Sequence, residues 1–120
     1  MSEVRFVIPL ATKPCPRPRV TGKNCYYPPT YEQWRRDAAL FFPSPLWEGP
    51  VWLDVTFHGS APNADIDNML KSICDLGTGR LWIDDRQVER IKAEKLPVID
   101  PRDRRTEIKA GRLTPEETEI

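Results

Sequence analysis

Two short acidic motifs hold the residues of this 120-residue chain that are best suited to metal binding or catalysis. The motifs are Asp65-x-Asp67-Asn68-x-x-Lys71 and Asp84-Asp85-x-Gln87. Their four carboxylates, with no histidine or cysteine beside them in either motif, are the oxygen ligands that hard cations such as Mg²⁺ or Mn²⁺ prefer. Such a cation polarises a phosphodiester and lowers the pKa of an attacking water. Lys71 lies one helical turn beyond Asp67, where its charge would offset that of the phosphate.

The chain has few residues suited to zinc binding, nucleophilic catalysis or calcium binding. The chain has one histidine, His58, and its three cysteines form no CxxC pair. A zinc site of the usual ligands is therefore excluded, and so is Ser-His-Asp or Cys-His catalysis unless His58 acts alone. An EF-hand at Asp65 is excluded because its turn glycine would fall at Leu70 and its bidentate glutamate at Leu76.

Each acid also has an ordinary structural interpretation. Asp65 stands at the expected N-cap of a helix, and Asp67 in its first turn suits the helix dipole. Asp67 and Lys71 form a surface pair worth only a few tenths of a kcal/mol, and Asp84-Asp85 is compatible with a solvated turn. For any one residue this interpretation is preferred, but the combination of both motifs favours a metal site.

Hydrophobic periodicity and proline positions predict the elements that must position these motifs. The expected elements are strands at 4–10, 51–58, 87–96 and 106–110, helices at 31–42 and 65–77, and a proline-rich loop at 11–29. This order, βαβαββ, predicts an α+β fold in which two main helices pack on a small, single-layer mixed sheet.

The first helix and the second acidic motif carry more detailed expectations. Thr30 and Gln33 match a capping box, and the spacing of Trp34, Ala38 and Phe41 predicts that these three side chains face inward. After the glycines at 77 and 79, the chain can return so that the second motif lies alongside the second helix and its N-terminal end.

The two motifs together resemble the RusA-type Holliday junction resolvases, a family of crossover junction endodeoxyribonucleases. The resemblance covers about residues 4 to 110 and is carried by residues 65–71, Asp75 and residues 81–88. It implies an α+β homodimer that binds four-way junction DNA and cuts two opposed strands symmetrically, with Mg²⁺ or Mn²⁺ as cofactor. The implied catalytic residues are Asp65, Asp67, Asp85 and Lys71; the implied metal ligands are Asp65, Asp67, Asp84 and Asp85; Asn68 and Gln87 are implied as supporting polar residues.

The distribution of charge favours a DNA-binding surface. The 18 basic and 18 acidic residues cancel, but four acids belong to the motifs and three glutamates lie in the last five residues, which leaves a surplus of bases elsewhere. Phosphate binding needs such a surplus. The expected DNA contacts are Lys13, Arg17, Arg19, Lys23, Arg35 and Arg36. A solvated loop is the alternative, and the same holds for a second group of arginines at 102–105.

The sequence therefore predicts a metal-dependent, structure-selective DNA endonuclease that resolves Holliday junctions in recombination and repair. Two alternatives remain: a Mg²⁺-dependent nuclease acting on other branched DNA or on nucleotides, and a non-catalytic junction-binding module. One domain is expected at 1–112, followed by an acidic, mobile tail at 113–120. No membrane partner or small-molecule cofactor is expected, and the cytoplasm of a bacterial or phage-infected cell is the expected location.

Overall fold

The computed structural model describes residues 2–17, 19–22 and 24–113, although not the side chains at 19–21, 24 and 25. Its elements are β1 (Glu3–Ile8), β2 (Arg19–Thr21), β3 (Asn24–Tyr26), α1 (Pro29–Ala39), β4 (Val51–His58), α2 (Ile66–Gly77), β5 (Val88–Leu96) and β6 (Arg105–Arg112), with short 3-10 helices η1 (Asp85–Gln87) and η2 (Pro101–Asp103). Apart from Leu113, the predicted acidic tail lies outside the described residues.

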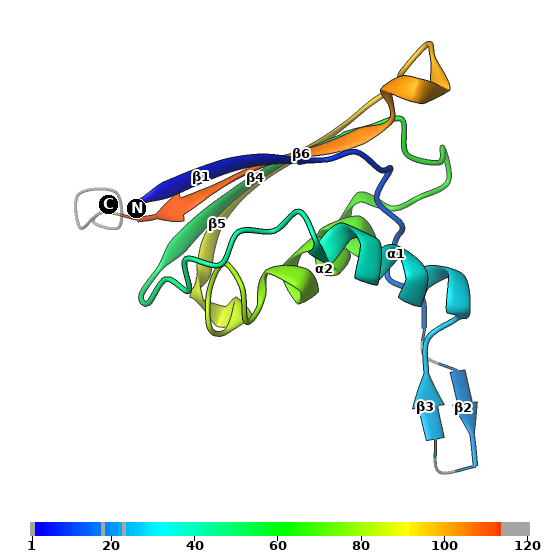
Figure 1. The fold of residues 1–120 in the computed structure, drawn as a ribbon, viewed down its shortest axis with the longest axis horizontal. Coiled ribbons are helices and arrows are strands. Elements are labelled where there is room, and N and C mark those ends of the chain that lie inside the picture. The colour runs from blue at the N-terminus through cyan, green and yellow to red at the C-terminus, as the bar shows by residue number, and fades with distance from the viewer. Residues whose placement is uncertain (1, 18, 23, 114–120) are drawn as a thin grey trace.

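The predicted mixed sheet with two helices is confirmed. Four strands lie in the order β1-β6-β4-β5. β6 is antiparallel to both β1 and β4, whereas β4 and β5 are parallel. Both helices lie on the same face of the sheet, and the short β2–β3 hairpin projects away from it (Figure 1).

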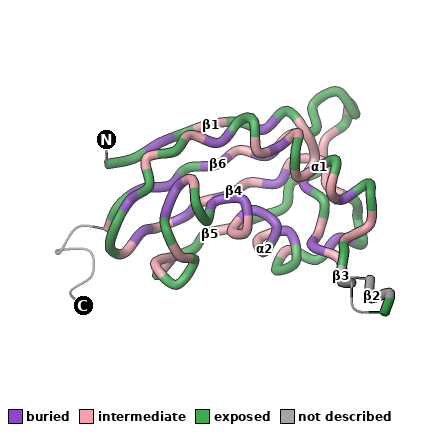
Figure 2. Tube along the Cα trace, turned by 60° about the horizontal axis from the view of Figure 1, so that its bottom comes forward, coloured by how far each residue is buried: buried purple, intermediate pink, exposed green. Residues whose placement is uncertain are grey.

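The core lies between this face and the helices. Along β4 every second residue is buried, beginning at Val51 and ending at Phe57, as expected for a strand covered on one face. The apolar residues Met69, Ile73 and Leu76 of α2 pack against the same cluster. Figure 2 shows the buried positions gathered on the central strands and the helices, with the connecting loops largely exposed.

Three predictions of local structure are wrong. Residues 11–29 are not all loop, because they contain the β2–β3 hairpin. α1 begins at Pro29 behind Pro28, without a side-chain capping bond, so the predicted capping box is absent. α1 also ends at Ala39, so Phe41 lies beyond the helix and does not follow the helical period. Phe41 is therefore 42% exposed instead of facing inward, and Phe42 is buried in its place.

The β4–α2–β5 unit determines where the acidic motifs lie. Because β5 is parallel to β4, the chain must return to the starting end of β4 before β5 can begin. α2 makes this return, from the loop after His58 to the turn before η1. The beginning of α2 therefore lies at one end of the sheet and η1 at the other. None of the described helices is long and apolar enough to span a membrane.

Candidate active site

The first acidic pair lies at the beginning of α2. Asp65 occupies the N-cap position, but its side chain makes no capping hydrogen bond. Asp67 is exposed, and its Oδ1 accepts a hydrogen bond of 2.9 Å from the backbone N–H of Asn68. Capping therefore does not occupy the Asp65 carboxylate, and both acids face solvent at the positive end of the helix dipole.

Lys71 and Asp75 continue this face of α2 along the helix. Lys71 is exposed and Asp75 is half-buried. Burial raises the pKa of Asp75, and the positive charges of Lys71 and Arg35 oppose that rise, while the nearby charge of Asp85 adds to it. Asp85 also contributes to the raised pKa of Cys74, which burial brings to about 11. Asp85 thus lies beside the second half of α2.

The second acidic pair is held by a capping box around η1. The Asp84 carboxylate accepts hydrogen bonds from the backbone N–H of Arg86, at 3.0 Å, and from its guanidinium, at 3.1 Å. These bonds, the backbone one first, hold the pKa of Asp84 below its usual range. Asp84 therefore shapes the loop, whereas Asp85 is exposed and presents its carboxylate to solvent.

Gln87 fixes η1 to the rest of the protein. Its Oε1 accepts hydrogen bonds from the backbone N–H groups of Ile83 and Asp84, at 2.9 and 2.8 Å. Its Nε2 donates to the carbonyls of Trp47 and Gly49, at 2.8 and 2.9 Å. All the hydrogen-bonding groups of the amide are used for positioning, which gives a structural basis for the supporting role predicted for Gln87.

The two acidic pairs do not meet within one chain. Among the described residues, no group of three or more His, Cys, Asp or Glu side chains is close enough to hold a metal ion. α2 has 12 residues, a length of about 18 Å at the usual helical rise. The expectation that the second motif returns to the N-terminal end of α2 is wrong, because parallel pairing requires η1 at the opposite end of the sheet.

The donor chemistry nevertheless fits a hard divalent cation. Asp65, Asp67 and Asp85 are exposed carboxylates, the ligand type that Mg²⁺ binds while keeping several of its waters. A single chain offers two such acids at one end of α2 and one at the other. Asp84 is already engaged with Arg86.

The match to known families agrees with this arrangement. The family model of endodeoxyribonuclease RusA matches residues 9–110. The chain belongs to this family. RusA proteins are endonucleases that resolve Holliday junctions and depend in general on divalent metals. The matched range contains both acidic motifs and all elements from β2 to β5. No curated protein matches the chain significantly.

The early loop of this RusA domain crosses α2 beside the first acidic pair. The backbone N–H of Cys15 donates to the carbonyl of Asn68 at 3.1 Å, and Ser72 Oγ donates to the carbonyl of Lys13 at 2.7 Å. The side chains of Lys13 and Arg17 are exposed. The fold thus brings the loop that carries these two predicted DNA contacts beside the first turn of α2, although Asp67 lies 50 or more residues away from them in the chain.

The other predicted DNA contacts differ in their surroundings. The Arg35 guanidinium lies 5.7 Å from the centre of the Tyr27 ring and 3.5 Å from the Glu32 carboxylate, so it packs within the domain. Arg36 is exposed and donates to Gln33 at 3.1 Å. The side chain of Arg19, and Lys23 altogether, lie outside the described part of the chain.

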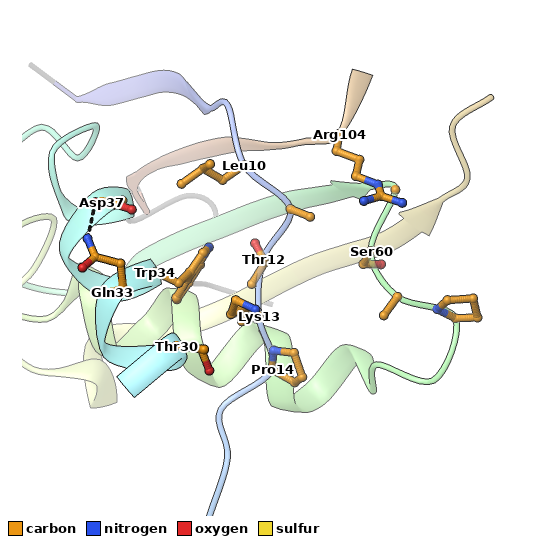
Figure 3. A pocket seen from close by; sticks show the side chains of 14 residues that line it. Leu10, Thr12, Lys13, Pro14, Thr30, Gln33, Trp34, Asp37, Ser60 and Arg104 are labelled. Carbon is orange, nitrogen blue, oxygen red and sulfur yellow. Dashed lines mark hydrogen bonds between the residues drawn. The ribbon is translucent and has the colours of Figure 1, made fainter. Parts of the chain in front are cut away.

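A hollow of about 720 Å³ lies between the early loop and the loop that follows β4. It is bounded by the early loop, by α1 and by residues 59–62, which lead to Asp65 (Figure 3). Lys13 and Arg104 contribute positive charge to its lining. The Trp34 ring also lines it, and the buried Nε1 of this indole has no hydrogen-bond partner. Asp37 also lines the hollow, so its lining carries both signs of charge.

One contact near the site has no signal in the sequence. Lys95, the second-last residue of β5, donates from its Nζ to the carbonyl of Ala64 at 2.7 Å and to that of Pro62 at 3.5 Å. This lysine ties the loop that carries Asp65 to the end of β5. A lysine on a strand ordinarily indicates only solvent exposure, so the link could be found only in the tertiary structure.

Proposed function

We propose that this RusA family member is a Mg²⁺- or Mn²⁺-dependent endonuclease that resolves Holliday junctions by paired, symmetric nicking. The observation that carries the proposal is the presence of exposed, oxygen-only ligands beside a basic loop, within a domain matched over residues 9–110 by the RusA family. A four-way junction presents closely spaced phosphates. The basic loop would bind them and guide one phosphate to the acids.

The residues take distinct roles in this proposal. Asp65, Asp67 and Asp85 would hold the metal ion, and Asp84 supports them by shaping η1 and can serve as a further ligand. When bound, the ion would polarise the phosphodiester and lower the pKa of the attacking water. Lys71, exposed one turn beyond Asp67, would offset the charge that develops on the phosphate. The enzyme would work as a homodimer in the cytoplasm of a bacterial or phage-infected cell.

The test is cleavage of a synthetic four-way junction with and without Mg²⁺. The wild type should produce two symmetric nicks, and EDTA should stop them. Asp67→Asn should lower the rate on the order of a hundredfold or more while retaining junction affinity. Glu3→Gln, an acid-to-amide change on the far edge strand, is the matched control and should cut like the wild type. Intact junctions with the wild type, or equal cutting by Asp67→Asn, would refute the proposal.

The same variants separate the two alternatives. A nuclease for other branched DNA would cut flaps or linear duplexes as fast as junctions. A non-catalytic binding module would bind junctions but cut no substrate with any divalent metal. The exposed Asp65 favours the nuclease, because its carboxylate makes no capping hydrogen bond and is therefore free to bind a metal ion.

A further inference from the structure

The hollow between the early loop and the loop that follows β4 has the size and the lining of a small-molecule site. Its volume of about 720 Å³ falls within the roughly 300–1,000 Å³ of ligand pockets in proteins. Apolar side chains, among them Leu10, Pro14 and Pro62, form part of its wall, and polar groups lie between them. A wall of this composition suits a flat molecule that is apolar on its faces and polar at its edge.

Trp34 supplies a hydrogen-bond donor that the protein leaves unused. The residue is 4% exposed, and its indole Nε1 is buried without a hydrogen-bond partner. In Figure 3 this nitrogen lies at the edge of the ring that faces Leu10 and Thr12, two other residues of the lining. A buried donor without a partner is unfavourable, so a ligand that accepts this hydrogen bond removes a cost that the free protein bears.

Asp37 places an acceptor next to this donor. It follows Trp34 by three residues on α1, so both side chains lie on the same face of the helix, and both line the hollow. Its Oδ1 accepts a hydrogen bond of 2.9 Å from Gln33 Nε2, whereas its Oδ2 has no hydrogen-bond partner among the described residues. A donor beside an acceptor matches an acceptor atom beside an amino group. Adenine, cytosine and guanine each have such an edge, and thymine has no amino group.

Lys13 and Arg104 bring positive charge to the same hollow. Both side chains are exposed, and neither forms a salt bridge with any residue that the structure describes. The neighbouring Arg102 and Arg105 are instead paired with carboxylates, at 2.8 and 2.9 Å. The stem of Arg104 lies against Gly59, where an added Cβ would be only 2.6 Å from Arg104 Cγ. Arg104 is thus held beside the hollow, with its charge free to meet a phosphate.

We propose that this hollow binds one unpaired nucleotide of the DNA strand, with a base that carries an amino group. The base would accept a hydrogen bond from Trp34 Nε1 and donate one to Asp37, while Lys13 and Arg104 would bind the adjacent phosphates. The inference rests on the proposed function, because the branch point of a junction is where a base leaves its stack at the lowest cost. The lining loop continues to Asp65, so the strand held here can extend toward the first acidic pair.

The first test is an NMR titration of the whole protein without a divalent metal. The chain has four tryptophans, and the indole N–H signal that is lost in Trp34→Phe assigns Trp34. The trinucleotide d(CCC) should shift this signal until it saturates. The trinucleotide d(TTT) should bind at least about fivefold more weakly, because it lacks the amino group. The indole of Trp52, on the outer face of β4, is the internal control and should not move.

Four results would overturn the proposal. A Trp34 signal that does not move would show that no base enters the hollow, and equal affinity for d(CCC) and d(TTT) would remove the contact to an amino group. An equal shift with a trinucleotide of abasic sites would leave a phosphate site only. Free dCMP bound as tightly as d(CCC) would assign the hollow to a free nucleotide. None of these measurements depends on cleavage, so they stand even if the proposed nuclease function fails.

The second test measures the affinity of variants for labelled trinucleotides by fluorescence anisotropy. Trp34→Phe keeps an aromatic ring but removes the donor, and should weaken d(CCC) binding about fivefold; Trp52→Phe is its control and should bind like the wild type. Asp37→Ala should lower the affinity for d(CCC) to that for d(TTT). Arg104→Ala should weaken both by the same factor, because a phosphate contact does not depend on the base. Unchanged d(CCC) binding by Trp34→Phe, or continued discrimination by Asp37→Ala, would overturn these contacts.

Discussion

At the scale of single residues, Ser72 links three segments of the protein. Its side chain is fully buried. It accepts a hydrogen bond from the Tyr31 hydroxyl of α1 at 3.1 Å and donates one to the Lys13 carbonyl of the early loop at 2.7 Å. One hydroxyl on α2 thus holds both the first helix and the basic loop beside the first acidic pair.

Removing the Ser72 hydroxyl should destabilise the protein more than removing the Tyr31 hydroxyl. Ser72→Ala removes the hydrogen bonds to both the Tyr31 hydroxyl and the Lys13 carbonyl, and we expect it to lower the free energy of unfolding by about 2 to 3 kcal/mol. Tyr31→Phe removes its own hydroxyl with the bond and should cost about 1 kcal/mol. Urea denaturation measures both, with the exposed Ser44→Ala as control. A Ser72→Ala variant no less stable than Tyr31→Phe would contradict this account.

The double variant gives a second check on the same network. Once Ser72 is alanine, the Tyr31 hydroxyl no longer has its bond to Ser72, so removing that hydroxyl should cost less than in the wild type. Strictly additive losses would show that the two hydroxyls act independently.

At the scale of elements, η1 depends on Gln87, which joins it to the loop before β4. The substitution Gln87→Glu keeps an acceptor for the N–H groups of Ile83 and Asp84. It also replaces the Nε2 donor with a carboxylate oxygen facing the carbonyls of Trp47 and Gly49. We expect the free energy of unfolding to fall by about 2 kcal/mol at neutral pH. Junction cleavage should also be slower, because η1 carries Asp85.

The pH dependence of that loss has a defined sign. The two carbonyls disfavour the charged form of the introduced glutamate, so its folded pKa is raised above the unfolded value of about 4.3. The loss should be greatest above the folded pKa and should shrink as the pH falls toward the unfolded value. Unfolding of Gln87→Glu and the wild type should be compared from pH 7 to pH 4. A difference that grows toward acid pH would contradict this explanation.

At the scale of the whole molecule, basic and acidic residues are unevenly distributed, although their charges sum to zero. Lys13 and Arg17 are exposed on the loop that crosses α2, on the same side of the sheet as the acids. Phosphate contacts release bound counterions, so junction affinity should fall as salt rises.

Combining Lys13→Ala with Arg17→Ala should weaken junction binding and reduce the slope of log affinity against log salt by roughly 2. The control combines Arg5→Ala with Lys109→Ala, two exposed residues on the face of the sheet away from the helices. It should leave the slope nearly unchanged. Equal effects from the two double variants would show that DNA binds through total charge and not through the early loop.

Much of this protein could be predicted from its sequence, because local patterns decide local structure. The alternation in β4 and the helical period of α2 fixed two elements almost to their ends. The pair of acidic motifs indicated the RusA family, which the family match confirms. Residue type was sufficient for these predictions, since burial of an apolar face and the oxygen chemistry of carboxylates both follow directly from it.

The relative positions of the motifs depended on the tertiary structure. Strand periodicity does not reveal whether β5 runs parallel or antiparallel to β4, yet this choice sends Asp65 and Asp85 to opposite ends of α2. The end of α1 at Ala39, which exposes Phe41, and the hairpin within the early loop were likewise decided by packing. The sequence alone determined which residues carry the chemistry; strand direction, set by contacts between distant segments, decided which of them lie together in one chain.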